Sequence, residues 1–159
     1  MTRDEGPGDL DNVDAWRTPT ASQAAGLTLA AARRMIEAAE STARGLRVAM
    51  SIAVVDAGDQ LVAFARMDGA DLVTTNLARD KAFSALMNRM PTRDLAPLVQ
   101  PGAEFYGYDS LAGGRMVVFA GGMPLERGGV LVGALGVSGG SAEEDQLAAD
   151  AAVAALAQA

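Results

Sequence analysis

Apolar residues recur at three- and four-residue steps along two stretches of the chain, and this is the period of a helix with one buried face. The first stretch covers residues 28–45 and places its charged side chains on the opposite face. Thr28 is a suitable N-terminal cap, and Gly45 is a suitable left-handed stop. A second helix is predicted from residue 74 or 75 to about 88, and a third from the Ser-Ala-Glu-Glu capping box at 141–144 to about 158.

Shorter apolar runs bounded by Gly, Pro or Asp predict β-strands. Residues 48–55 and 60–65 flank the sequence Asp56-Ala57-Gly58-Asp59. Four residues of turn chemistry between two such runs predict a hairpin. Residues 66–70 leave the second strand as a loop and lead toward the second helix.

A second hairpin is predicted where an apolar run at 116–120 meets Gly121-Gly122-Met123-Pro124, with a further strand at 130–137. Residues 125–127 add a short strand to it. The run at 130–137 does not alternate with polar residues, which favours a central strand covered on both faces. Eight of the twenty residues from 121 to 140 are Gly. They suit tight turns and equally a rim where a ligand approaches the backbone, and both interpretations stay open.

Hairpin connections dominate this order of elements, so we predict an α+β domain with an antiparallel sheet and flanking helices. Residues 27–159 form this single domain in the prediction. Residues 1–26 hold Gly, Pro, Asp and Thr without periodicity and are expected to form a flexible tail. Trp16, the only tryptophan, lies in that tail. The last helix is apolar almost all round, which points to a homo-oligomer, a dimer or larger.

Composition narrows the possible functions. The net charge of −7 argues against a nucleic-acid partner, because binding phosphates requires clustered Lys and Arg. The chain has no Cys and no His, so a thiolate or imidazole metal site, a cysteine nucleophile and a histidine base are excluded, and we expect no metal site. The sequence has neither a long apolar run nor the apolar core of a signal peptide. We therefore expect a cytoplasmic protein that does not enter a membrane.

Lys81 stands out because it falls inside the apolar arc of the predicted helix 74–88, between Leu77 and Ala85. Its stem can lie along apolar surface while the ammonium reaches water. Alternatively, Lys81 is a partly buried cation that meets an anionic ligand or a carboxylate.

Two loops carry further candidate chemistry. The segment Glu104-Phe105-Tyr106-Gly107-Tyr108 follows a short capped turn or helix at 91–100 and holds both tyrosines of the chain. Scarce aromatics gathered in one loop suit a pocket wall or lid, and equally a subunit contact. In the loop after the first hairpin, Arg66 is able to bind a carboxylate of a ligand or to pair with Asp68.

Four segments, in their order and spacing, carry a family resemblance: Ala53-Val54-Val55-Asp56-Ala57-Gly58, Arg66-Met67-Asp68-Gly69-Ala70, Lys81-Ala82-Phe83-Ser84-Ala85, and Gly121-Gly122-Met123-Pro124 with Gly133-Ala134-Leu135-Gly136-Val137-Ser138-Gly139. Together they resemble the GlcG/HbpS family, which is also seen as the C-terminal domain of PduO-type cobalamin adenosyltransferases. The resemblance covers roughly residues 27–157.

The resemblance implies a profilin-like fold with about five antiparallel strands, and assembly into dimers or larger rings. It also implies binding of haem or a corrinoid, so either is a possible cofactor. Without His or Cys, axial ligation of haem falls to Met, Tyr, Lys or a hydroxyl.

Two functions follow as hypotheses, ahead of a purely structural role. The first is a protein that binds a planar or anionic small molecule, such as haem or a corrinoid, with ligand contacts from Arg66, Asp68, Lys81, Tyr108, Gly121, Gly122, Ser138 and Gly139. The alternative is a cofactor-independent isomerase, lyase, deaminase or cyclase acting on a small carboxylated substrate. In that enzyme Lys81 or Glu104 transfers the proton, and Tyr106 or Tyr108 polarises the substrate or donates to it. The backbone N–H groups of residues 138–140 hold developing negative charge.

Overall fold

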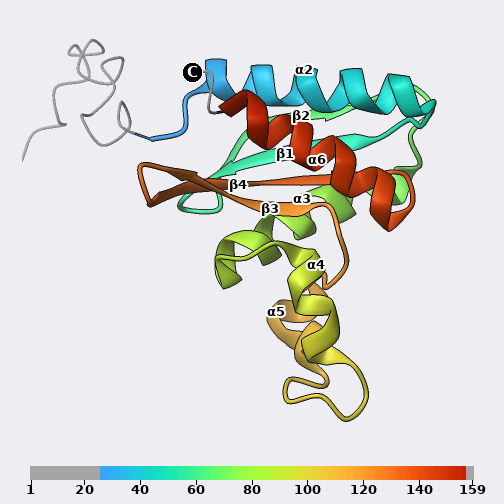
Figure 1. The fold of residues 1–159 in the computed structure, drawn as a ribbon, viewed down its shortest axis with the longest axis vertical. Helices are drawn as coiled ribbons and strands as arrows, with labels where there is room; N and C mark the ends of the chain where they lie inside the picture. Colours follow the sequence, from blue (N-terminus) through green and yellow to red (C-terminus); the bar gives the residue numbers. More distant parts are fainter. Residues whose placement is uncertain (1–25, 157–159) are drawn as a thin grey trace, which may run out of the picture.

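The computed structural model describes residues 26–156 (Figure 1). Most of the predicted tail at 1–26, including Trp16, lies outside the described residues. The helices and strands follow one another as α2 (Leu29–Leu46), β1 (Ser51–Asp56), β2 (Leu61–Arg66), α3 (Leu72–Asn88), α4 (Thr92–Leu95), the 3₁₀ helices η1 (Ala96–Val99) and η2 (Tyr108–Ser110), α5 (Leu111–Gly114), β3 (Gly122–Arg127), β4 (Val130–Ser138) and α6 (Ala142–Leu156).

The four strands form one antiparallel sheet in the order β2-β1-β4-β3, and this confirms the predicted α+β architecture. The first hairpin is confirmed, with β1 and β2 on either side of the turn at 57–60. The long strand β4 lies in the middle of the sheet, as its unbroken apolar run predicts. Its last residue, Ser138, pairs with Ser51, which also pairs with Arg66.

The prediction for the second hairpin was wrong in its first half. Residues 116–120 are not a strand, and the described sheet has four strands, where the resemblance implied about five. Side chains from the helices bind the backbone there instead: Ser84 Oγ accepts from Val117 N at 2.7 Å, and Thr92 Oγ1 donates to Phe119 O at 2.7 Å. Strand β3 begins at Gly122 and includes Pro124, which is tolerated because β3 is an edge strand.

Helix boundaries differ from the prediction at two ends. Helix α2 is capped by Thr28 Oγ1, which accepts from Ala31 N at 3.2 Å, but it continues past Gly45. The left-handed residue that ends it is Arg47, with φ of 61°. Helix α3 begins at Leu72, two or three residues before the predicted start.

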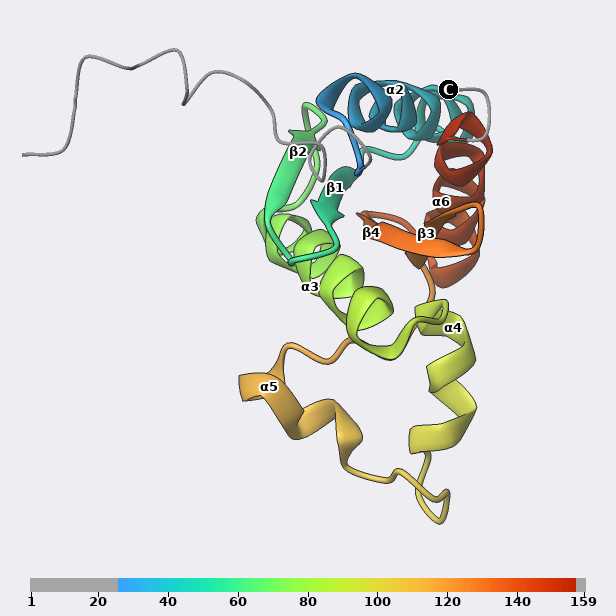
Figure 2. The same cartoon turned by 90° about the vertical axis from the view of Figure 1, so that its left-hand side faces the viewer.

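The sheet separates two packed layers (Figures 1 and 2). Helices α2 and α6 lie side by side over one face and enclose the larger core with residues such as Met35, Ile52 and Leu135. Helix α3 covers the other face, where Ala82 and Ala85 pack against the sheet. Small side chains allow this close approach: a Cβ on Gly136 would collide with the Ala78 carbonyl of α3.

Residues 89–121, which we call the extension, leave the end of α3, project away from the sheet and return to β3 (Figure 2). They include α4, η1, η2 and α5. Arg115 anchors the return segment: its Nε donates to Asp80 at 3.0 Å, and its guanidinium lies 3.9 Å from the ring centre of Phe83. None of the helices within residues 26–156 has the length and apolarity that crossing a membrane requires.

Candidate functional site

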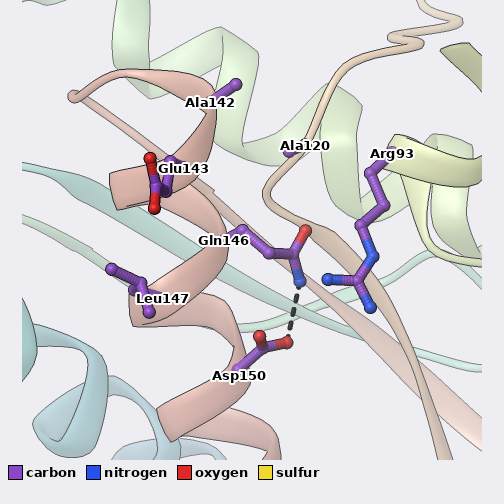
Figure 3. Close-up of a pocket in the computed structure, with 7 residues that line it drawn as sticks. All are labelled: Arg93, Ala120, Ala142, Glu143, Gln146, Leu147 and Asp150. Atoms are coloured by element: carbon purple, nitrogen blue, oxygen red, sulfur yellow. Dashed lines mark hydrogen bonds between the residues drawn. The ribbon is translucent and has the colours of Figure 1, made fainter.

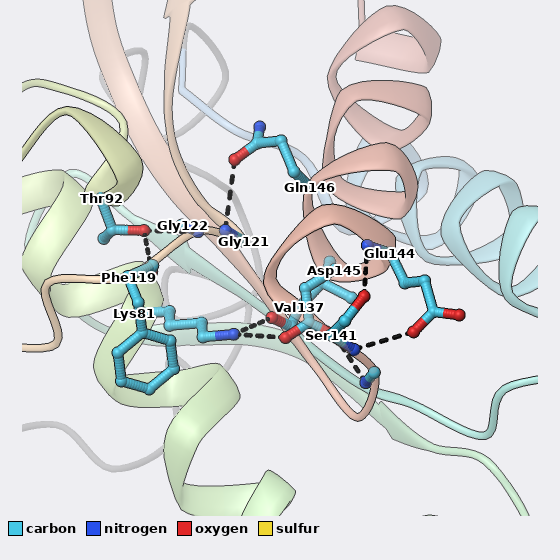
Figure 4. A network of polar contacts seen from close by, with 11 residues as sticks. Lys81, Thr92, Phe119, Gly121, Gly122, Val137, Ser141, Glu144, Asp145 and Gln146 are labelled. Atoms are coloured by element: carbon cyan, nitrogen blue, oxygen red, sulfur yellow. Dashed lines mark hydrogen bonds and ion pairs between the residues drawn. The ribbon is translucent and has the colours of Figure 1, made fainter. Parts of the chain in front are cut away.

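Lys81 is fully buried and forms an ion pair with Asp145 of α6, whose side chain is 3% exposed (Figure 4). The Lys81 Nζ atom lies 2.6 Å from Asp145 Oδ2 and 2.9 Å from the Val137 carbonyl of β4. Both partners come from elements far along the chain, so the side chain of Lys81 connects α3, β4 and α6. One of the two interpretations of Lys81 from the sequence was a partly buried cation that meets an anionic ligand or a carboxylate. The structure shows Lys81 fully buried and paired with a carboxylate.

The surroundings of Lys81 set its acid–base behaviour. Burial lowers the pKa of Lys81 from its ordinary value, and the charge and hydrogen bond of Asp145 oppose that shift. The ring of Phe119 lies 4.9 Å from Nζ, at cation–π distance, and is itself 45% exposed. The Lys81 ammonium thus bonds to both β4 and α6, and its side chain is not exposed to water.

The predicted residues Gly121 and Gly122 lie directly beside this ion pair. A Cβ on Gly121 would come within 3.0 Å of Lys81 Nζ and 2.5 Å of the Val137 carbonyl, and φ there is +110°. The two amides are already bonded: Gly121 N–H donates to Gln146 Oε1 at 3.3 Å, and Gly122 N–H donates to Thr92 Oγ1 at 2.9 Å. Both glycines therefore permit close packing around Lys81.

The loop after β4 contains the predicted residues Ser138 and Gly139. Asp145 Oδ1 accepts from Gly140 N at 2.8 Å, so Asp145 binds the loop with one oxygen and Lys81 with the other. Glu144 Oε2 accepts from Ser141 N at 2.8 Å, which confirms the predicted capping box. Carboxylates of α6 thus bind the amides of Gly140 and Ser141, and of these Gly140 belongs to the segment that the sequence predicts as an anion site.

Arg66 and Asp68 are exposed at the same end of the sheet as Ser138. The Arg66 guanidinium donates to the Ala70 carbonyl at 3.3 Å, and these two described side chains, Arg66 and Asp68, form no ion pair with each other. Between Arg66 and Ser138, Ser51 shares a hydrogen bond of 2.7 Å with Thr74. Cross-strand partners point to the same face of a sheet. Arg66, Ser51 and Ser138 therefore form a polar row on the face that α3 covers.

The remaining predicted residues belong to the extension. Glu104 and Tyr106 are exposed and lie in the loop between η1 and η2, which forms the outer tip of the extension (Figure 1). Tyr108 is half-buried, and its hydroxyl donates to Asn88 Oδ1 at 2.6 Å. Within one chain, the structure does not bring Glu104 and Tyr106 together with Lys81.

The extension encloses a cleft of about 320 Å³, which we call the extension cleft. Its walls are mostly apolar or aromatic, and its lining residues are Asn88, Met90, Leu95, Leu98, Val99, Phe105 and Tyr108. The rings of Phe105 and Tyr108 lie 6.2 Å apart, centre to centre, with a tilt of 55°. Tyr108 is the residue of this cleft that the sequence analysis had named as a ligand contact.

Sequence reasoning missed Thr92, Asp145 and Gln146, all of which are buried and bond to the segment around Lys81. Asp145 carried a usable signal, since it is an acidic residue on the buried side of an apolar helix and therefore requires a cationic partner. Within residues 26–156, no group of three or more acidic side chains is arranged to hold a metal ion.

Comparisons of the sequence and the fold with known proteins identify the family of this chain. A family model described as "Haem degrading protein HbpS-like" matches residues 27–154. The chain is 39% identical over 131 residues to the uncharacterized 15.0 kDa protein of the dhaT–dhaS intergenic region of Citrobacter freundii. That match covers 82% of this chain and 92% of the relative.

Two further relatives carry names that refer to cofactors. The corrinoid adenosyltransferase PduO of Salmonella typhimurium is 42% identical over 124 residues, a match that covers 77% of this chain but only 37% of PduO. The crystal structure of a PduOC:heme complex superposes with a TM-score of 0.79 at 39% identity, covering 82% of this chain and 94% of that one. From the family match over residues 27–154 and these relatives, the chain belongs to the HbpS-like family.

Proposed function

We propose that this chain binds a planar, anionic small molecule of the haem or corrinoid class, and that the extension cleft holds the flat part of the ligand. Two similarities support the ligand class: the match to the HbpS-like family, and the 39% identity to a protein crystallised with haem. The residues of the cleft support the location.

The observation that carries the proposal is the chemistry of the extension cleft. A volume of about 320 Å³ falls in the range of small-ligand pockets, and the mostly apolar lining suits a conjugated ring system. Phe105 and Tyr108 present aromatic faces, while Leu95 and Leu98 supply aliphatic surface. Arg89 does not line the cleft, but it is exposed and lies between two lining residues in the sequence, so we expect it to pair with an acidic substituent at the edge of the cleft.

The side chains of the cleft can also be compared with the ligands that haem iron takes in proteins. The chain has no His or Cys, so the usual imidazole and thiolate ligands are missing. The cleft contains the thioether of Met90 and the phenol of Tyr108, and both side-chain types serve as haem ligands in proteins. The Tyr108 hydroxyl already donates to Asn88, whereas the sulfur of Met90 has no such bond among the described residues, so Met90 is the better candidate.

The predicted ligand residues at the end of the sheet define a competing location. Lys81 is fully buried and paired with Asp145, but Arg66 is exposed and able to bind a carboxylate. An Arg66→Ala variant therefore distinguishes the two locations. If Arg66 and Ser138 hold the ligand, this variant weakens binding and changes in the extension do not.

A haemin titration followed by absorbance tests the proposal. We expect a saturable, shifted Soret band for the unaltered chain, a weaker complex for Phe105→Ala, and an altered band position for Met90→Leu. Met87→Leu is a matched control, because Met87 is exposed on α3 and does not line the cleft. A chain that gives no saturable band, or one whose band responds to Arg66→Ala but not to the cleft variants, would refute the proposed site.

A further inference from the structure

A second groove, separate from the extension cleft, lies between α4 and α6 (Figure 3). It has a volume of about 370 Å³ and is lined by Arg93, Ala120, Ala142, Glu143, Gln146, Leu147 and Asp150. None of these residues belongs to the sites predicted from the sequence.

The two walls of this groove carry opposite charges. Arg93 projects from α4 toward Gln146 and Asp150 of α6 (Figure 3). Glu143 and Asp150 are seven residues apart, which is about two helical turns, so they lie on one face of α6. The one ion pair of Arg93 among the described residues joins its Nε to Asp94 at 3.8 Å, and both side chains are at least half exposed. Such a pair is weak, so the guanidinium is available to a ligand.

Gln146 fixes the acidic wall in place. Its side chain is largely buried, and its amide oxygen accepts from Gly121 N at 3.3 Å. The amide nitrogen donates to Asp150 Oδ1 at 2.8 Å. Asp150 is exposed, and because Gln146 holds its Oδ1 the side chain loses little entropy when a ligand binds.

Apolar residues lie beside the charged side chains of this groove. Ala120, Ala142 and Leu147 line the groove, and Leu147 is 47% exposed. The groove thus combines a cation that suits a carboxylate, an anion that suits an ammonium, and an aliphatic surface beside them. A ligand of one charge would satisfy one wall and leave the opposite charge of the other wall unpaired.

We propose that this groove binds a small zwitterion, namely a free α-amino acid with an aliphatic side chain. Its carboxylate pairs with Arg93 and its ammonium with Asp150. Its side chain lies on the surface of Ala142 and Leu147. Both ion pairs are open to water, so the expected affinity is in the millimolar range, about −4 kcal/mol.

Nuclear magnetic resonance titration of the full chain with L-leucine tests this inference. We expect saturable shifts of backbone amides in α4 and α6 at ligand concentrations of about 1–10 mM. 4-Methylpentanoate is leucine without its ammonium, and 3-methylbutan-1-amine is leucine without its carboxylate, so each is expected to bind at least about tenfold more weakly, a loss of about 1.4 kcal/mol.

Arg93→Gln and Asp150→Asn remove one charge each and are expected to weaken L-leucine binding by about tenfold. Arg127→Gln, at an exposed position of β3 outside the groove, is the matched control. The inference is overturned if L-leucine causes no saturable shifts, if either half-molecule binds as tightly as L-leucine, or if both groove variants bind it like the control.

Discussion

The buried pair of Lys81 and Asp145 allows a quantitative prediction about stability. Replacing Lys81 by Met preserves an unbranched side chain but leaves the Asp145 carboxylate, 3% exposed, without its cation. Replacing Asp145 by Asn leaves the fully buried ammonium with a neutral amide and the Val137 carbonyl. Removing one partner of such a pair typically costs about 3–5 kcal/mol, because an uncompensated charge stays inside the protein.

Urea unfolding followed by circular dichroism measures this loss. With a slope of about 2 kcal/mol per molar urea, a loss of about 3–5 kcal/mol moves the midpoint down by about 1.5–2.5 M. The double variant Lys81→Met with Asp145→Asn buries no charge and is expected to be more stable than either single variant.

An exposed pair provides the control for this experiment. Arg44 and Glu40 are one helical turn apart on α2, with an Nη1–Oε2 distance of 3.4 Å, and Glu40→Gln is expected to change stability by no more than about 0.5 kcal/mol. The reasoning fails if Lys81→Met costs as little as Glu40→Gln, or if the effects of the two single variants simply add in the double variant.

Three further substitutions test the packing and the helix ends. Gly45→Ala, inside α2 with no atom near its added Cβ, is expected to stabilise the chain by about 0.5–1 kcal/mol in thermal unfolding. Gly136→Ala pushes a Cβ against the Ala78 carbonyl and is expected to cost about 1–3 kcal/mol or more. The hydrogen bonds with Ser141 hold the pKa of Glu144 below its ordinary value of 4.5. Because the folded pKa lies below the unfolded one, this contribution is complete above pH 4.5 and is lost as the pH falls through the folded pKa. The urea midpoint of the unaltered chain should therefore fall more steeply below pH 4.5 than that of Glu144→Gln.

Each of these expectations has a clear contrary result. A destabilising Gly45→Ala would mean that the last turn of α2 is not helical in solution. A neutral Gly136→Ala would mean that α3 lies further from β4 than the structure places it. Parallel pH profiles for the unaltered chain and Glu144→Gln would contradict the capping role of Glu144.

Hydrophobic patterning, together with capping and turn residues, was enough to predict the three long helices and the first hairpin, because these signals lie within each segment. It failed at residues 116–120, where the run is as apolar as a strand. There the side chains of Ser84 and Thr92 bind the backbone, and those two residues lie far away in the sequence. A pattern within one segment does not reveal a partner that comes from another.

The same limit applies to the candidate site. Lys81 was recognisable because a charge inside an apolar arc is unusual, but Asp145 lies 64 residues further along the chain. The extension cleft is formed by short helices without a clear hydrophobic period, so Met90 and Leu98 gave no signal of a shared pocket. Only the folded chain brings these side chains together.

A crystal structure of the chain grown with haemin would test the proposed function most directly. We predict electron density for the ring system in the extension cleft, with one face against Phe105 and Tyr108 and the iron on the side of Met90. Density at the sheet end beside Arg66 and Ser138, with an empty extension cleft, would contradict the account.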